Sequence, residues 1–210
     1  MCGRFPITLS ASELAQIIDQ AFGLSFEASF DLPHYNVAPT QSVPAMIKAN
    51  HGYRIGPLRW GLKHPKGHLM INTRLESITQ GTTGLSNPLK RCVVFNSGFY
   101  EWDQEKQPYY VRPITPGLYA FAGVYQKMDD GTFGFSLITG PSNAPLNAIH
   151  ARQPWLMRLD EIPHFLDEKT PLPSRFKALP LTLHPVTKKV NQAPFNDPSN
   201  IEPIQIERLV

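Results

Sequence analysis

The pattern of apolar residues near the N-terminus predicts one amphipathic helix. Ser10 and Glu13 have the spacing of a capping box, in which each side chain bonds the backbone N–H of the other residue. Apolar residues then recur three and four positions apart from Leu14 to Phe22, and Gly23 follows as a stop signal. We therefore expect a helix that begins just after Ser10, ends at Gly23 and buries one face.

Beyond an irregular, proline-containing stretch from Leu32 to Ser42, the pattern changes to short apolar or alternating runs. Many of these runs are bounded by Gly, Pro or Asn, as strands commonly are. The predicted strands are Val43–Ala49, Tyr53–Trp60, Arg91–Asn96, Tyr109–Arg112, Leu118–Gln126, Thr132–Thr139, Leu181–Pro185 and Ile204–Leu209.

The remaining signals predict turns and peripheral helices. Asp130-Gly131 is a hairpin turn signal between two apolar runs. A short helix is expected from Asn143 to about His150, and another from Asp160 to Leu166. The expected fold is a single α+β domain over residues 1–210. It has a mainly antiparallel, barrel-like sheet and a few peripheral helices.

Composition excludes several classes of protein. The 210 residues include 21 prolines, twice the usual share of about 5%. These argue against a bundle of long helices, because an interior proline costs a helix about 3 kcal/mol. With 41% hydrophobic and 18% charged residues, the chain lacks the signature of disorder. The net charge of +3 is compatible with a polyanionic partner without requiring one.

Targeting and cofactor signals are missing from the sequence. Two cysteines cannot form a disulfide framework or a closed zinc site. No apolar run approaches the length of about 20 residues that spans a bilayer, and the N-terminus does not read as a signal peptide. Common nucleotide-binding, metalloprotease and hydrolase motifs are also missing. We expect a cytoplasmic protein without membrane contact, metal or cofactor.

Cys2 is the residue with the most chemical potential. Removal of an initiator Met, usual before a small residue, would leave an α-amine and a thiol on this one residue. Their reference pKa values are about 7.7–8.0 and 8.5. Such a 1,2-aminothiol condenses with an aldehyde, because the amine forms a Schiff base and the thiol closes it to a thiazolidine. The alternative is that Cys2 is a small hydrophobic residue at the start of a strand.

Two other residues could move protons. Glu101 lies among Phe99, Tyr100 and Trp102, and burial by such neighbours raises the pKa of a carboxyl group and suits it to general acid–base work. It could equally be an outward-facing residue at a strand end. His150 can exchange protons near neutral pH, although most of the seven histidines must be structural.

Several polar and aromatic residues could contact nucleic acid. Asn72, Arg74 and Glu76 alternate and would share one face of an extended segment, which suits a sugar-phosphate contact or a solvated edge. Arginines and aromatic rings are what single-strand binders use. The candidates are Arg4, Arg59, Arg74, Arg91, Arg152, Trp60, Trp102 and Tyr35.

Taken together, these segments resemble the SRAP (SOS-response-associated peptidase) family of abasic-site processing proteins. The resembling motifs follow one another in the family's order along nearly the entire chain. They are residues 1–5, 35–41, 59–62, 72–77, 91–92, 98–102, 121–125, 138–139 and 149–154, together with Asn143.

The resemblance implies a covalent reaction with damaged DNA. After Met1 removal, Cys2 would attack the ring-opened aldehyde of an abasic site and form a thiazolidine crosslink. Asn72 would hold the abasic sugar and the Cys2 amine. Glu101 would be the acid–base group, and His150 would shuttle protons at the same sugar.

The resemblance also implies a positively charged groove for single-stranded DNA. Phosphates would be held by Arg4, Arg74 and Arg152, and neighbouring nucleotides would pack against Trp60 and Trp102. The expected partner is single-stranded DNA that contains abasic sites, and we expect the protein to be a monomer.

Two other functions use the same residues. The first is an N-terminal-nucleophile thiol peptidase with Cys2, Glu101 and His150, which could include removal of its own Met1. The second is a module that binds single-stranded DNA without covalent chemistry. A nucleophilic cysteine beside acid–base groups serves a peptidase and a crosslinking enzyme alike, so the residues alone leave these readings open.

Overall fold

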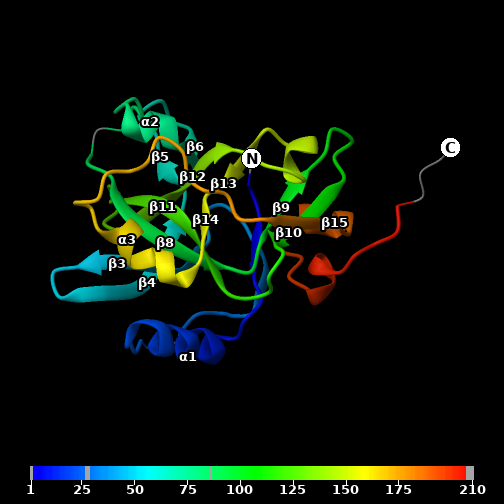
Figure 1. The fold of residues 1–210 in the computed structure, drawn as a ribbon, viewed down its shortest axis with the longest axis horizontal. Coiled ribbons are helices and arrows are strands. Elements are labelled where there is room, and N and C mark those ends of the chain that lie inside the picture. The colour runs from blue at the N-terminus through cyan, green and yellow to red at the C-terminus, as the bar shows by residue number, and fades with distance from the viewer. Residues whose placement is uncertain (1, 27–28, 86, 207–210) are drawn as a thin grey trace.

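Strands dominate the fold of the computed structural model, which describes residues 2–26, 29–85 and 87–206 (Figure 1). The helices are α1 (Ala11–Phe22), α2 (Leu75–Thr79), α3 (Ile162–Leu166) and the 3-10 turns η1 (Leu146–Ala148), η2 (Leu159–Glu161), η3 (Lys188–Asn191) and η4 (Pro198–Ile201). The strands are β1 (Phe5–Ile7), β2 (His34–Val37), β3 (Ser42–Ala49), β4 (Gly52–Trp60), β5 (Leu62–Lys63), β6 (Leu69–Met70), β7 (Asn72–Arg74), β8 (Lys90–Asn96), β9 (Phe99–Trp102), β10 (Pro108–Pro113), β11 (Tyr119–Lys127), β12 (Phe133–Pro141), β13 (Arg152–Pro154), β14 (Leu156–Met157) and β15 (Leu181–Pro185).

The N-terminal helix forms as its sequence predicts. The Ser10 N–H donates to Glu13 Oε2 at 2.8 Å, and the Glu13 N–H donates to Ser10 Oγ at 3.3 Å. Gly23 ends the helix with a φ of +60°, in the left-handed region that glycine adopts without strain. Leu14 and Ile18 are fully buried, so the apolar face of α1 packs on the sheet.

The main sheet closes on itself in part. β12 pairs with both β4 and β11, so the strand path β12-β4-β3-β8-β11 returns to β12. The pairings along this path are antiparallel apart from β12 with β4, and β7 also joins β12 in parallel. The expected α+β class with a mainly antiparallel sheet is confirmed.

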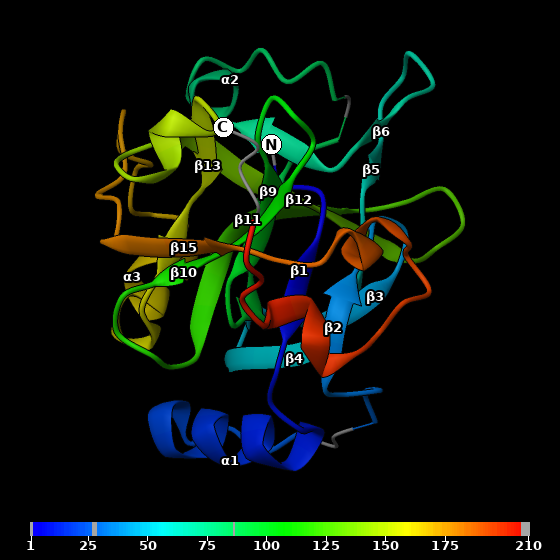
Figure 2. The ribbon, with the colours of Figure 1, turned by 90° about the vertical axis from the view of Figure 1, so that its right-hand side faces the viewer.

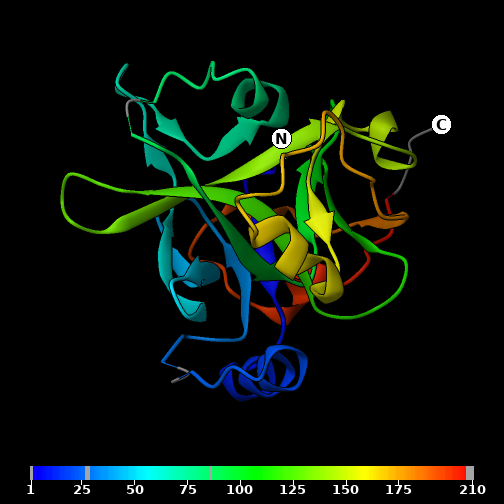
Figure 3. The same ribbon diagram turned by 60° about the vertical axis from the view of Figure 1, so that its left-hand side comes forward.

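The main sheet has a core on each face. In β11, Phe121 packs in one apolar cluster with Phe5 and Trp60. Its neighbours Ala120 and Ala122 pack in the other cluster, to which α1 and α3 contribute. Because successive side chains point to opposite faces of a strand, β11 must be apolar at nearly every position. Figure 3 shows α1 and α3 lying outside the sheet.

A second sheet, of β9, β10 and β15, lies beside the N-terminal segment. The Tyr100 N–H donates to Arg4 O at 2.9 Å, which joins the residues before β1 to β9. β1 itself pairs with β2. Residues 186–206, which we call the C-terminal segment, run beside β1 and β2 (Figure 2).

Most predicted elements are confirmed, and three differ. The stretch from Leu32 to Ser42 contains β2, and the helix expected from Asn143 is only the single turn η1. In the last predicted strand, residues 204–206 are not a strand and residues 207–209 lie outside the described residues. No helix in the described ranges is long and apolar enough to cross a membrane.

Candidate functional site

Cys2 is fully buried next to β9, and its surroundings favour the protonated, uncharged form of the thiol. The thiol donates a weak hydrogen bond to Arg4 O, with Sγ and O 3.6 Å apart. Burial raises the pKa of the Cys2 thiol far above its ordinary value, and the charge of Glu101 raises it further. The structure therefore brings Cys2 and Glu101 together and favours a protonated thiol at neutral pH.

Glu101 owes its position to strand pairing. It lies in β9, opposite Tyr109 of β10, and only 3% of its surface is exposed. The Trp102 N–H lies 3.4 Å from Glu101 Oε1 and donates to it. The sequence suggested burial among aromatic neighbours or an outward-facing position, and the structure has the buried arrangement.

Asn72 contacts Cys2 from β7, a strand of the main sheet. It begins β7, where it lies in register with Leu137 of β12. Its Nδ2 donates to Cys2 O at 2.8 Å. Its Oδ1 is buried and accepts no hydrogen bond from the part of the chain that the structure describes. Asn72 thus fixes the backbone of Cys2 and retains one acceptor.

A hollow of about 450 Å³ opens beside Asn72. Its walls are residues 68–74, Ser77, Thr82 and Thr83. Arg74 is exposed and lies on this wall. The hollow reaches Asn72, the residue whose side chain holds the backbone of Cys2.

His150 lies in the short connection between η1 and β13. Its residue is half-buried, and its Nδ1 accepts from the Arg152 N–H at 3.1 Å. Its carbonyl oxygen accepts from Ser142 Oγ at 2.6 Å. β13 and β7 lie on opposite sides of β12, where Thr139 is in register with both Arg74 and Pro154.

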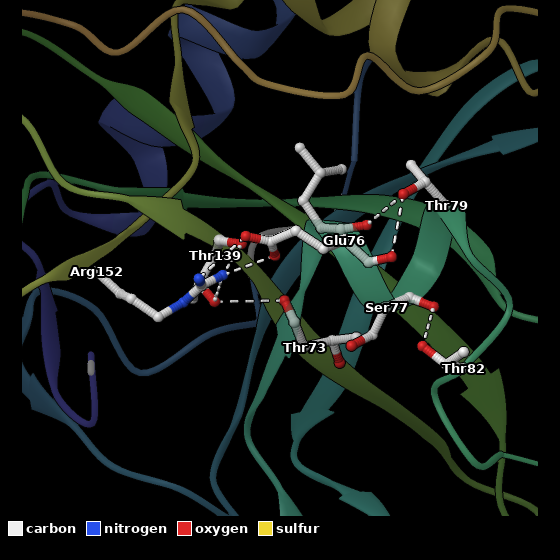
Figure 4. Close-up of polar contacts among 8 residues, drawn as sticks. Thr73, Glu76, Ser77, Thr79, Thr82, Thr139 and Arg152 are labelled. Carbon is white, nitrogen blue, oxygen red and sulfur yellow. Dashed lines mark hydrogen bonds and ion pairs between the residues drawn. The ribbon is translucent and has the colours of Figure 1, made fainter.

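The two predicted phosphate-binding arginines other than Arg74 already have protein partners. Arg152 makes a two-pronged ion pair with Glu76, and its Nη2 also donates to Thr139 O at 2.8 Å (Figure 4). Arg4 Nη1 donates to Asn36 Oδ1 and to Val190 O, both at 3.2 Å. A phosphate would have to share these guanidinium groups.

The two predicted tryptophans have different environments. Trp102 is partly exposed, and its Nε1 donates to Asn191 Oδ1 at 2.8 Å. Trp60 is fully buried, donates to Ile71 O at 3.0 Å and stacks on Phe135. The expectation that Trp60 packs against a nucleotide is therefore corrected, because its indole has no exposed face to offer.

The sequence reasoning missed the structural contacts of two residues, Asn36 and Glu76. Asn36 is fully buried and its Nδ2 lies within hydrogen-bonding distance of three carbonyl oxygens of the C-terminal segment. Glu76 was placed on an extended face, but Leu75 begins α2 and the Glu76 carboxylate meets Arg152. The only signal for Asn36 was its place within a resembling motif, and the alternation of Glu76 with Asn72 and Arg74 gave no indication of its ion pair.

No cluster of three or more His, Cys, Asp or Glu side chains in the described ranges could hold a metal ion. His64 and His68 stack on one another, with ring centroids 4.3 Å apart. Cys92 is fully buried in the core of the main sheet.

Comparison with known families agrees with the motifs. The family model described as SOS response associated peptidase (SRAP) matches residues 1–193. The chain belongs to the SRAP family. The resemblance seen in the motifs is thereby confirmed for nearly the whole SRAP chain.

Individual relatives of this SRAP protein carry informative names. It is 34% identical over 197 residues to abasic site processing protein YoaM of Bacillus subtilis, with 85% of each chain covered. It is 31% identical over 227 aligned residues to abasic site processing protein YoqW of the same species, covering 96% of this chain and 99% of YoqW. Abasic site processing protein HMCES of Xenopus tropicalis is 26% identical, with 94% and 77% covered.

A solved structure shares the fold. The crystal structure of a protein from Bacteroides thetaiotaomicron matches with a TM-score of 0.77 at 19% identity, covering 97% of this SRAP chain and all of the other. At this identity the match supports the architecture of the sheets and says nothing about activity.

Proposed function

We propose that this protein recognises abasic sites in single-stranded DNA and links itself to them covalently through Cys2 once Met1 has been removed. The names of the bacterial and vertebrate relatives support the substrate class. The observation that carries the proposal is that two other candidate site residues meet at Cys2. Asn72 Nδ2 donates to its carbonyl oxygen at 2.8 Å, and the charge of Glu101 raises the pKa of its thiol.

The reaction needs only the groups of Cys2 and the aldehyde. The amine nitrogen attacks C1′ of the ring-opened sugar, and the resulting carbinolamine loses water to give a Schiff base. Sγ then adds to the imine carbon, and the nitrogen takes up the proton that the thiol gives up. The product is a thiazolidine, one water is released, and no oxidant or reductant is needed.

Glu101 is the group suited to move the thiol proton. Because burial raises the pKa of the thiol, the proton stays on Sγ until the imine is in place, and a nearby carboxylate can carry it from Sγ to the nitrogen as the S–C bond forms. The same carboxyl group can assist the opening of the closed sugar, since the aldehyde forms only after the ring hemiacetal opens.

His150 has a separate task in this proposal. A Schiff base at C1′ can close to the thiazolidine, or it can lose a proton from C2′ and cleave the strand. An imidazole with a reference pKa near 6.5 can donate or accept a proton at either branch. Its ring is held against the backbone of Arg152, beside β12.

DNA binding would use the positive side chains around the hollow. Arg74 lines the hollow beside Asn72 and is exposed. Arg4 and Arg152, which are partly exposed, would share their guanidinium groups with phosphates, and Trp102 leaves part of its ring open to a base. Trp60 has no such part in the proposal.

The deciding experiment is incubation with single-stranded DNA whose uracil has been converted to an abasic site by uracil glycosylase. We expect an adduct that survives denaturation and whose intact mass equals protein without Met1 plus DNA minus one water. Cys2→Ser can form at most an imine, and a protein that retains Met1 should not react. An equally abundant heat-stable adduct with Cys2→Ser would disprove the thiazolidine. No adduct with the wild type would leave a peptidase or a passive DNA binder.

A further inference from the structure

Glu76 and Arg152 form a two-pronged ion pair near the candidate site. Arg152 Nη1 donates to Glu76 Oε1 at 3.1 Å, and Nη2 donates to Oε2 at 2.9 Å. The Arg152 side chain is only 17% exposed and that of Glu76 is 41% exposed. The hydrogen bonds from Arg152 hold the pKa of Glu76 below its ordinary value. Paired planar groups of this kind fix direction as well as distance.

The ion pair bridges two segments across β12 (Figure 4). Glu76 lies in α2, which directly follows β7, and Arg152 begins β13. Both β7 and β13 pair with β12. Arg152 Nη2 also donates to Thr139 O of β12 at 2.8 Å, so the guanidinium group touches all three segments.

Each end of the bridge leads to a candidate site residue through hydrogen bonds. On one side, β7 carries Asn72, whose Nδ2 holds Cys2 O. On the other, the backbone N–H of Arg152 donates to His150 Nδ1. A continuous series of short connections therefore runs from Cys2 to the His150 ring.

We infer that Glu76 is a positioning residue. By holding Arg152, it fixes the position of the His150 turn relative to β7, the strand that carries Asn72. Glu76 meets Arg152 directly and acts on the site through it. The kinetic part of this inference rests on the proposed function, and its structural part does not.

The kinetic test compares Glu76→Gln with Asp160→Asn. Glu76→Gln keeps the size and one acceptor oxygen but loses the charge. Because a misplacement of about 1 Å can cost about 100-fold in rate, we expect crosslinking of abasic DNA to slow by about tenfold or more while affinity for intact single strands changes by less than about twofold. Asp160 forms an exposed ion pair with Arg158, so Asp160→Asn is the matched loss of a carboxylate outside the site and should react like the wild type.

A double-mutant cycle tests whether Glu76 acts through Arg152. If it does, Glu76→Ala combined with Arg152→Ala should slow crosslinking no more than Arg152→Ala alone. Additive losses would overturn the inference. So would a wild-type rate in Glu76→Gln, or a gain in DNA affinity without a change in rate. That last result would mean that Glu76 only competes with phosphates for Arg152.

A structural measurement separates this inference from the proposed function. The ring nitrogen chemical shifts of His150 in ¹⁵N-labelled protein can be recorded without DNA. We expect Glu76→Gln to shift them and Asp160→Asn to leave them unchanged. A wild type that forms no adduct would remove the proposed function. Unchanged His150 shifts in Glu76→Gln would remove the positioning role whatever the DNA assay gives.

Discussion

Arg4, two residues from Cys2, and Arg152, at the start of β13, are both partly buried and are held in opposite ways. Arg4 donates only to uncharged acceptors, the Asn36 amide and the carbonyl oxygens of Val190 and Asn191. Arg152 faces the Glu76 carboxylate. Burial lowers the pKa of Arg4, but an arginine remains charged at neutral pH. The partners of Arg4 therefore leave its positive charge uncompensated, whereas Glu76 largely neutralises that of Arg152.

This difference gives the two sides different duties. Hydrogen bonds to uncharged acceptors are not weakened by salt, and they leave the charge of Arg4 able to attract a phosphate. The same hydrogen bonds tie the residues next to Cys2 to the C-terminal segment. A charged pair is screened by salt and responds to acid. The Glu76–Arg152 pair joins α2, which follows the strand of Asn72, to β13, which follows His150. The predictions below test the contrast from the largest expected effect to the smallest.

The largest effect should come from the carboxyl group on the Arg4 side. Glu101→Gln keeps the size of the side chain and removes its ability to take the Cys2 thiol proton. We expect crosslinking to slow by about 100- to 10,000-fold, the usual contribution of a positioned acid–base group. Single-turnover kinetics on abasic DNA measure it, and binding to intact DNA is the control. Unchanged kinetics would make Glu101 a structural residue.

The C-terminal segment should loosen when Asn36 is removed. Asn36→Ala removes one donor from three carbonyl oxygens of the segment and one acceptor from Arg4, each of which keeps another partner. Since each lost hydrogen bond costs about 1 kcal/mol net, we expect the free energy of unfolding to fall by about 3 kcal/mol.

The same variant has a local readout. Lys188 and Lys189 are exposed within the C-terminal segment, so trypsin should cleave there faster in Asn36→Ala than in the wild type. Asn147→Ala, at another exposed turn, is the control and should leave both measurements unchanged. A stable variant with wild-type cleavage would show that Arg4 and Asn36 do not hold the segment.

The salt dependence of DNA binding should differ between the arginines. Each phosphate contact adds about 0.7 to the slope of log affinity against log salt for single strands. Arg74 is exposed, so Arg74→Ala should lower the slope by about that amount. Arg152 is already paired with Glu76, so Arg152→Ala should lower it by less. Intact oligonucleotides are used because they cannot crosslink, and equal changes in slope would contradict the contrast.

Local elements could be predicted from the sequence because their causes are local. The Ser10–Glu13 capping box and Gly23 lie within fifteen residues of each other and act within one helix. The alternating or continuous apolar runs likewise identify strands without reference to the rest of the chain. The motifs around Cys2, Asn72 and Glu101 pointed to three residues that the structure brings together.

Non-local features could not be predicted in this way. The acceptors of Asn36 lie more than 150 residues along the chain, in a segment with no distinctive pattern. Trp60 beside Arg59 reads like a stacking residue, but the parallel pairing of β4 with β12 buries it. Glu76 alternates with Asn72 and Arg74, yet a helix begins one residue before it. Each outcome depends on which strands meet.

The smallest predicted effect is the response of the Glu76–Arg152 pair to acid. Arg152 holds the pKa of Glu76 below its ordinary value, so the pair stabilises the fold above the unfolded value of about 4.3 and this contribution is lost as the pH falls through the lower folded value. Because Glu76 is partly exposed, the contribution is about 1 kcal/mol or less. Urea unfolding of the wild type and Glu76→Gln measures it. The difference between their free energies of unfolding should be largest at pH 7 and shrink steadily below about pH 4.3.

Asn36→Ala is the control for this pH dependence. Its difference from the wild type should stay constant over that range, because neither the amide nor the carbonyl groups it meets can titrate. Parallel behaviour of the two variants would mean that the two sides are not held by different forces.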